Sequence, residues 1–217
     1  TTLVDTFYQP EPFASSPSQQ KYVTHGVLKL APNGDLIWGR GLSPNATNSR
    51  GLSDMAIDGQ GNVYLTGYFG QTVDIFYPDT TFTTLLERPN SSALLGQKLF
   101  LLKYSATGEL LWSSIAWSST NYHDDTFSTG IEVTEDGRIF LAGRNRGSHL
   151  NFENPDGSRT QVQVGAAFLA KLSQEGICQW IRGTATPGQS GKFLKLEMAG
   201  EKLYLEGRIH WPGNNTT

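Results

Sequence analysis

The residues best suited to chemistry on this chain fall in one polar segment near its middle. It carries the aromatic rings of Trp117 and Tyr122, the imidazole of His123 and the adjacent carboxylates of Asp124 and Asp125. Aromatic rings beside carboxylates and amides could stack on a sugar and hydrogen-bond its hydroxyls. These residues are therefore the candidate site for a ligand or partner. The alternative interpretation is a connecting loop whose Trp117 packs between neighbouring sheets.

The same segment is poorly arranged for catalysis. Asp124 and Asp125 are adjacent, so in an extended segment they point to opposite sides and make a poor acid–base pair. As calcium ligands they would need several more oxygens from elsewhere. The four histidines show no metal-ligand spacing, and the chain has no Cys-x-x-Cys motif, nucleophile elbow or phosphate loop. We therefore expect no enzyme: no catalytic residue, no cofactor and no bound metal.

Composition excludes several other classes of protein. The 217 residues include 24 glycines and carry a net charge of −3, with no basic stripe for nucleic acid. The apolar runs are too short to span a bilayer, and the first residues are no signal peptide, so any export signal would lie outside this chain. The single cysteine, Cys178, excludes an internal disulfide. It replaces Leu36 and Leu110 of the repeats described next, so it is predicted to be a small buried apolar residue.

One ten-residue pattern occurs three times. Its copies span Lys29–Trp38, Lys103–Trp112 and Lys171–Trp180, with Lys, Gly and Trp in the same relative places, and they start 74 and then 68 residues apart. Self-similarity at a long period is typical of an array of supersecondary units. Each copy predicts two short strands around a tight turn, whose glycine suits a residue with positive φ. The three lysines are predicted to be outward-facing strand residues rather than anion ligands.

Two further elements repeat. The first is a hairpin at Met55–Gly67, Ile131–Gly143 and Leu194–Gly207. Its last copy has a turn one residue shorter, which we interpret as keeping Leu194 and Leu196 in phase with Met55 and Ile57. The first turn, residues 58–62, resembles the start of a calcium loop but lacks the bidentate glutamate, so a hairpin turn is predicted. The second, weaker element occurs at Val4–Tyr8, Val73–Tyr77 and His149–Phe152 and predicts decorating hairpins or long loops.

Together these elements predict an all-β fold, a β-propeller. Each unit of about 70 residues would be a four-stranded antiparallel blade, with strands a–b and then c–d, and a decorating hairpin. The region covers 1–217, with units at approximately 1–70, 71–147 and 148–217. Only two blades are continuous, at 51–115 and roughly 129–183. A c–d hairpin at 26–42 and an a–b hairpin at 192–208 are left over.

The incomplete blades have a consequence for assembly. Three blades are fewer than the usual ~4–8, and open sheet edges invite association. We therefore expect an arc of a larger ring, completed by other blades of a longer protein or by a second copy of the chain. Two copies would give six blades by a two-fold arrangement. Closure of three blades within one chain is the strained alternative.

Binding is expected on one face of this propeller. In such a fold the d–a and b–c connections share a face, and here they are long and divergent. They span 41–53, 70–97, 116–128, 144–165 and 183–192. Function tends to lie in variable loops on a rigid scaffold, so the candidate segment at Trp117 is placed on that face.

The residues also resemble a known family. Gly51–Phe69, and Ala167–Leu172 followed by Gly176 and Trp180, resemble the SBBP-type bacterial β-propeller repeat. The resemblance implies large secreted or surface-attached bacterial proteins in which propellers act as binding or spacer modules. It supplies no catalytic residues.

We therefore expect a non-catalytic extracellular module for protein–protein assembly or adhesion on a bacterial surface. Its partners would be other blades, a second copy, a surface protein or a glycan, with no nucleic acid and no membrane insertion. One alternative is a carbohydrate-binding, lectin-like propeller. The other is a glycosidase or lyase, which needs convergent carboxylates near the axis, where strand a offers only Asp54, Glu132, Lys195 and Glu197.

Overall fold

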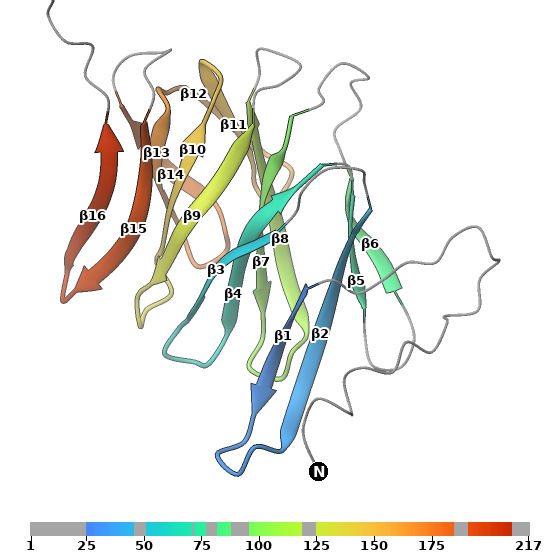
Figure 1. Cartoon of the computed structure of the whole chain (residues 1–217). Helices are drawn as coiled ribbons and strands as arrows, with labels where there is room; N and C mark the ends of the chain where they lie inside the picture. The colour runs from blue at the N-terminus through green and yellow to red at the C-terminus, as the bar shows by residue number, and fades with distance from the viewer. Residues whose placement is uncertain are drawn as a thin grey trace, which may run out of the picture.

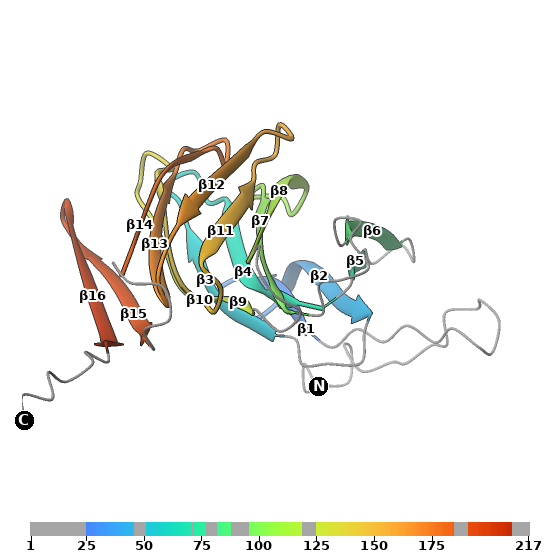
Figure 2. The ribbon, with the colours of Figure 1, turned by 90° about the horizontal axis from the view of Figure 1, so that it is seen from above.

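The protein is described from a computed structural model. The residues that the structure describes are 25–45, 51–70, 72–76, 82–87, 96–118, 125–184 and 191–209. Within these ranges the chain forms strands and turns and no helix. The strands build antiparallel sheets that follow one another as a fan (Figures 1 and 2), which confirms the prediction of an all-β, propeller-like fold.

The first complete blade, blade 2, is a meander of four strands. They are β3 (Gly51–Ile57), β4 (Val63–Phe69), β7 (Lys98–Tyr104) and β8 (Leu110–Ser118), paired in that order. Side chains alternate between the two faces of a strand, so neighbouring residues of β4 serve different cores. Val63 and Leu65 face the preceding sheet, called blade 1, whereas Tyr64 faces the following sheet, called blade 3.

Blade 3 repeats this arrangement. Its strands are β9 (Thr126–Val133), β10 (Ile139–Asn145), β13 (Ala167–Leu172) and β14 (Cys178–Gly183), again paired in order. Between blades 2 and 3 lies a core that includes Ile131, Leu141 and Phe168. A second core between blades 1 and 2 includes Leu102 and Ile115. Each apolar core is thus shared by two sheets, so a blade without a neighbour leaves one face uncovered.

A half-blade stands at each end of the fan. Blade 1 contributes the c–d hairpin of β1 (His25–Leu30) and β2 (Leu36–Asn45), and blade 4 the a–b hairpin of β15 (Gly191–Ala199) and β16 (Lys202–Ile209). Among the described strands, β1 pairs only with β2, and β16 pairs only with β15. Both half-blades therefore have one strand edge that no described strand pairs with, in agreement with the predicted incomplete blades.

The decorating hairpins extend the preceding blade. β5 (Thr72–Phe76) and β6 (Phe82–Glu87) leave blade 2 but pair with β2 of blade 1. In the same way β11 (His149–Glu153) and β12 (Arg159–Gln163) leave blade 3 and pair with β8 of blade 2. These parts of the connections 70–97 and 144–165 are therefore sheet strands that join neighbouring blades, not free loops.

The repeated glycines take the predicted left-handed conformation. Gly34, Gly108 and Gly176 have φ values of 90°, 83° and 81° at the same place in the three c–d turns. Each glycine N–H donates to a carbonyl three residues earlier, at 2.8 to 2.9 Å. Only glycine occupies such φ values without strain, which explains its return in every copy.

The phase proposed for the last a–b hairpin is wrong by two residues. Leu196 pairs with Leu205 as Met55 pairs with Leu65, so Leu196 and not Leu194 corresponds to Met55. The pairing of strand a is irregular around Leu194, where β15 skips a partner between Phe193 and Lys195. β3 has the same bulge between Leu52 and Asp54, so the bulge does not set the last copy apart. The difference lies in the a–b turn, which is one residue shorter: Met198 pairs with Leu203 as Ile57 pairs with Val63.

Candidate functional site

Of the predicted binding segment, the structure describes only Trp117 and Asp125. Tyr122, His123 and Asp124 lie outside the described residues. The Trp117 side chain is 8% exposed and belongs to the core between blades 1 and 2. The guanidinium of Arg159 lies 5.4 Å from its ring centroid. The ring is thus already packed on this part of the chain, and its role in stacking on a sugar stays a prediction.

Asp125 links the segment just before β7 to the segment just after β10. Its Oδ1 accepts a hydrogen bond from the Gln97 backbone N–H at 2.9 Å, and its Oδ2 lies 2.8 Å from Arg146 Nη1. The Arg146 N–H also donates to the Asp125 carbonyl at 3.0 Å. The Asp125 carboxylate therefore anchors the start of β9 and has its oxygens engaged within the fold.

The repeated Lys, Gly and Trp form one contact between neighbouring blades. Lys29 Nζ and Trp38 Nε1 of blade 1 both donate to the Ala106 carbonyl in the c–d turn of blade 2, at 2.9 and 3.0 Å. The Trp38 ring also covers Gly108, where an added Cβ would lie 2.7 Å from Trp38 Cδ2. We call this arrangement the Lys–Gly–Trp contact.

Blades 2 and 3 repeat the Lys–Gly–Trp contact. Lys103 Nζ and Trp112 Nε1 donate to the Gln174 carbonyl at 3.3 and 3.2 Å, and a Cβ on Gly176 would lie 3.1 Å from the Trp112 ring. Gln174 holds in the third copy the place that Ala106 holds in the second. The repeated pattern in the sequence thus marks a repeated inter-blade contact.

The expectation of outward-facing lysines is wrong for the first two copies. Lys103 is 4% exposed, and its ammonium lies 5.0 Å from the centroid of the Tyr64 ring. Burial lowers the pKa of Lys103, and the carboxylates of Asp58 and Glu175 partly offset that effect. These lysines do lie on one face of their strands, but that face packs against the next blade and not against solvent.

The third copy lacks a partner within the described residues. Lys171 and Trp180 of blade 3 are half-buried and make no bond equivalent to those of Lys103 and Trp112 in this part of the chain. Arg182 Cζ lies 5.9 Å from the Trp180 ring, as Arg40 Cζ lies 5.8 Å from the Trp38 ring. The donor side of the contact is therefore formed at blade 3, and the described part of blade 4, β15 and β16, holds no turn that would accept from it.

Large apolar side chains are exposed where blades are incomplete. In blade 1, Leu28 and Leu30 are 45% and 43% exposed, whereas their counterparts in blade 2, Leu102 and Tyr104, are fully buried. On β3, Met55 and Ile57 are 55% and 57% exposed, and no a–b hairpin covers them among the described residues of blade 1.

Blade 4 shows the same effect at the other end. Tyr204 and Leu205 of β16 are 56% and 39% exposed, whereas Tyr64 and Leu141 at the matching places of blades 2 and 3 are fully buried. Leu196 on β15 is buried against blade 3. In this half-blade, Leu196 of the inner strand β15 is therefore buried, whereas Tyr204 and Leu205 of the outer strand β16 are exposed.

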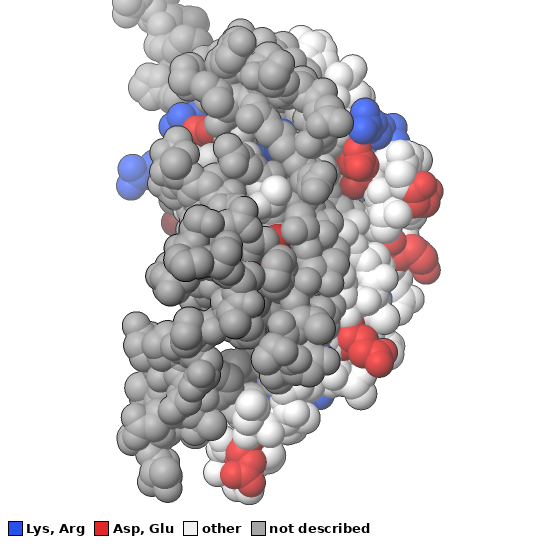
Figure 3. Space-filling view, turned by 90° about the vertical axis from the view of Figure 1, so that its right-hand side faces the viewer, with Lys and Arg blue, Asp and Glu red and all other residues white. Residues whose placement is uncertain are grey.

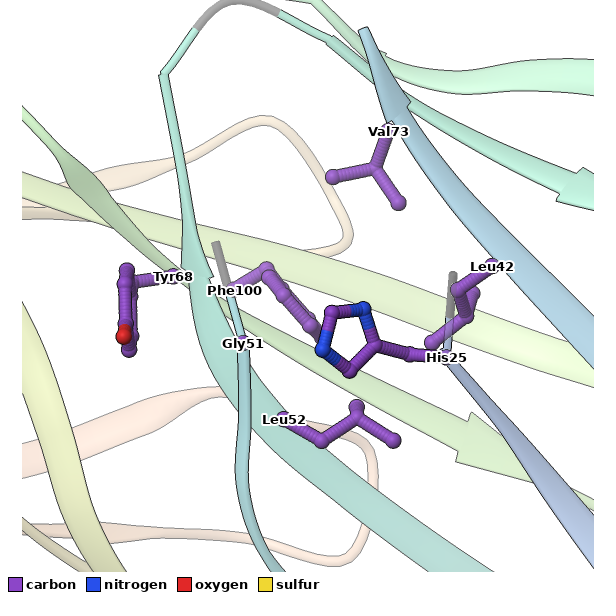
Figure 4. Close-up of a pocket in the computed structure, with 7 residues that line it drawn as sticks. All are labelled: His25, Leu42, Gly51, Leu52, Tyr68, Val73 and Phe100. Atoms are coloured by element: carbon purple, nitrogen blue, oxygen red, sulfur yellow. The ribbon is translucent and has the colours of Figure 1, made fainter. Parts of the chain in front are cut away.

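A small hollow adjoins the open edge of blade 1 (Figure 4). It has a cavity volume of only about 10 Å³, is partly open to solvent, and is lined by His25, Leu42, Gly51, Leu52, Tyr68, Val73 and Phe100. These side chains are mostly apolar and come from blades 1 and 2 and from β5. The hollow therefore continues the apolar surface at this end and offers few polar groups to orient a small molecule.

The carboxylates of strand a lie together but form no metal site. Burial raises the pKa of Glu132, and the charges of Asp54 and Glu197 raise it further. Asp54 Oδ2 accepts from the Ile131 backbone N–H at 3.0 Å, and Glu197 pairs with Lys195. Across the described residues, no three His, Cys, Asp or Glu side chains are placed to hold a metal ion.

Charge on the described surface gives no strong signal. On the face shown in Figure 3, acidic side chains stand apart along one margin with uncharged atoms between them. Burial raises the pKa of the Cys178 thiol to about 11, so this cysteine is an unreactive thiol packed against the core between blades 2 and 3. The part of the chain that is described holds no helix able to cross a membrane.

These features define the class of protein as an arc of β-propeller blades with two incomplete ends. No family model matches the chain. It is similar to an uncharacterized WD repeat-containing protein of Acanthamoeba polyphaga mimivirus, with 25% identity over 150 residues, which is 69% of this chain. The matched region is 10% of that protein's length.

The solved structures include a match to a protein of unknown function from Bacteroides caccae. It covers 70% of this chain and 66% of that chain, with 10% identity and a TM-score of 0.23. The distant similarity to a WD repeat-containing protein agrees with a repeat propeller. The resemblance to SBBP-type repeats stays a prediction.

Proposed function

We propose that this chain is a non-catalytic propeller module that binds protein partners through its two incomplete ends. The observation that carries the proposal is the exposure of Leu28, Leu30, Met55 and Ile57 at one end and of Tyr204 and Leu205 at the other. Exposed apolar patches on a soluble protein mark interaction surfaces. The WD repeat in the name of the viral relative supports the same class of function.

The polar groups give less support to an enzyme or a lectin. The carboxylates of Asp54 and Asp125 accept backbone hydrogen bonds, so they contribute to the fold. Trp117 is packed in a core between blades. Neither observation favours a catalytic or sugar-binding role, so the proposal rests on protein binding alone.

We further propose an extracellular setting, with adhesion or assembly at a bacterial surface as the role of the binding. The support for this setting is the resemblance of Gly51–Phe69 to SBBP-type repeats. Protease treatment of intact source cells tests it: cleavage of the protein without lysis is expected. Protection of the protein until the cells are broken would contradict the extracellular setting.

Protein binding is tested with a charged substitution at an exposed end. Ile57→Glu places a carboxylate in the apolar patch of blade 2, and the matched control Leu111→Glu does so at a residue that is 50% exposed on the same blade, away from both open edges. Proteins that cross-link to the wild-type chain in source cells are expected to be lost with Ile57→Glu and kept with Leu111→Glu. Equal cross-linking of all three chains would contradict the proposal.

A further inference from the structure

Resting on the proposed protein-binding function, we infer that the partner at the open ends is a second copy of this chain, docked head to tail. The c–d hairpin of the copy, β1 and β2, pairs with the a–b hairpin of the first chain, β15 and β16. One complete four-stranded blade then forms from two chains. A second copy fits because the described c–d hairpin of one chain and the described a–b hairpin of the other are the two halves of a blade.

The third Lys–Gly–Trp contact has its donors but no acceptor turn among the described residues. Lys171 and Trp180 of blade 3 present two donors toward the place where the c–d turn of the next blade would lie. In the two complete contacts the acceptor is the fourth residue of the repeated pattern, Ala106 or Gln174. The same position in the first copy of the pattern is Pro32, whose carbonyl lies in the turn of blade 1. The Pro32 carbonyl of a second copy is therefore the matching acceptor.

The glycine that the contact requires is also in place. Gly34 has a φ of 90°, close to the 83° of Gly108 and the 81° of Gly176. Both of those glycines lie under a tryptophan of the preceding blade. Gly34 can therefore take the Trp180 ring of a second copy in the same way.

The second argument is the register of the open edges. Strand b pairs with strand c at matched positions in both complete blades: Val63 faces Tyr104, and Ile139 faces Leu172. The same register places Leu203 of one chain opposite Leu30 of the other. It also pairs Leu205 with Leu28 and Tyr204 with Lys29, as Tyr64 pairs with Lys103.

The third argument is the side of the sheet on which the exposed apolar groups lie. In the joined blade, Leu28, Leu30 and Leu205 face blade 3 of the first chain, as Leu102 and Leu65 face the blade before theirs. Tyr204 faces the other way, toward Met55 and Ile57 of the copy. Tyr64 packs in the same manner in the core that contains Ile131. One junction thus covers the apolar residues exposed at both ends.

One chain cannot make this junction with itself. β1 and β16 lie at opposite ends of the fan in both ribbon views, with blades 2 and 3 between them (Figures 1 and 2). Two copies joined at both ends make a closed ring of six blades related by a two-fold axis. Six lies within the range of ~4–8 blades found in propellers.

Cysteine pairs across the junction test the inference. In a Cys178→Ala background, a Leu28→Cys chain is mixed with a Leu205→Cys chain and oxidised. Opposed residues of paired strands have Cα atoms about 4.5–5.5 Å apart, which a disulfide can span. We expect a covalent dimer of twice the 23.8 kDa chain mass. The matched control is Leu28→Cys mixed with Tyr204→Cys, whose side chain lies on the opposite face, and it is expected to lose the dimer.

The positions were chosen because all three residues are at least 39% exposed in the single chain, so the substitutions leave its cores intact. Absence of the Leu28–Leu205 dimer would overturn the inference, as would equal cross-linking of both pairs. If the dimer is absent while Ile57→Glu still abolishes binding of another protein, the protein-binding function stands and the self-association is wrong. If Ile57→Glu also has no effect on binding, both proposals are wrong.

Discussion

At the scale of single residues, the repeated lysine, glycine and tryptophan join neighbouring blades. The sequence predicted the turn and the positive φ of its glycine, because both are local properties. It did not predict the partners of Lys103 and Trp112. Their acceptor is the backbone carbonyl of Gln174 in another repeat, and a carbonyl belongs to every residue type. The repeated Lys and Trp mark where the donors lie, but the acceptor carbonyl leaves no residue-type signal in a single sequence.

Glycine substitutions test the contribution of the Lys–Gly–Trp contact to stability. Gly108→Ala adds a Cβ 2.7 Å from Trp38 Cδ2, whereas Gly157→Ala, at a φ of 80°, adds one with no atom within 4 Å. Both changes strain the backbone by about 1–2 kcal/mol, and Gly108→Ala is expected to lose a further ~1–3 kcal/mol from overpacking. Urea unfolding of the two variants measures the difference. Equal losses would mean that the tryptophan yields freely and contributes little.

Asp58 gives the fold a pH dependence. Burial raises its pKa, but hydrogen bonds from Asn62, Tyr64 and Gln60 together outweigh burial, so the pKa lies below the ordinary 3.8. The carboxylate therefore stabilises the fold above that ordinary value, and the contribution is lost as the pH falls through the lower, folded pKa. We expect Asp58→Asn to be less stable than wild type at about pH 7, and we expect the gap to narrow as the pH falls below the ordinary pKa of 3.8. A gap that is constant over this pH range would contradict this role.

At the scale of elements, the order of the hairpins and the two continuous blades were predicted correctly from the repeats. The sheet that each decorating hairpin joins was not predicted. β11 pairs with β8 of the preceding blade, and this edge-to-edge pairing depends on how blades stack. The packing of Trp117 between neighbouring sheets was one of the two interpretations of its segment, and the structure agrees with it: Trp117 lies near the end of β8 and belongs to a core.

Hydrogen exchange separates complete from incomplete blades. β10 is paired on both sides, by β9 and β13, whereas β16 is paired only by β15 among the described strands. A strand with one open edge exposes part of its backbone amides and opens more readily. In dilute solution we expect faster exchange in β16 than in β10, and slower exchange in β16 as the protein is concentrated. Protection of β16 equal to that of β10 at every concentration, in a chain of monomeric mass, would contradict this account.

At the scale of the whole molecule, the described strands form an arc whose two end hairpins complement each other. The sequence predicted the incomplete blades because the repeats begin and stop out of phase. It could not show which apolar residues stay uncovered, since Leu28 and Leu102 are the same residue type at the same place in a strand. The difference is 45% exposure against 0%, and among the described strands a neighbouring sheet covers Leu102 but not Leu28.

The central claim is that a second copy covers these ends, and the mass of the chain in solution tests it most directly. Sedimentation at micromolar concentration is expected to give twice 23.8 kDa for wild type and for Leu111→Glu, and the single-chain mass for Leu28→Glu. Leu28 and Leu111 are 45% and 50% exposed in the single chain, so a glutamate at either position should disturb the fold to a similar extent. The two variants then differ only in whether the charge lies at the proposed junction. A wild-type chain that sediments at 23.8 kDa, or a dimer that persists in Leu28→Glu, would contradict the claim.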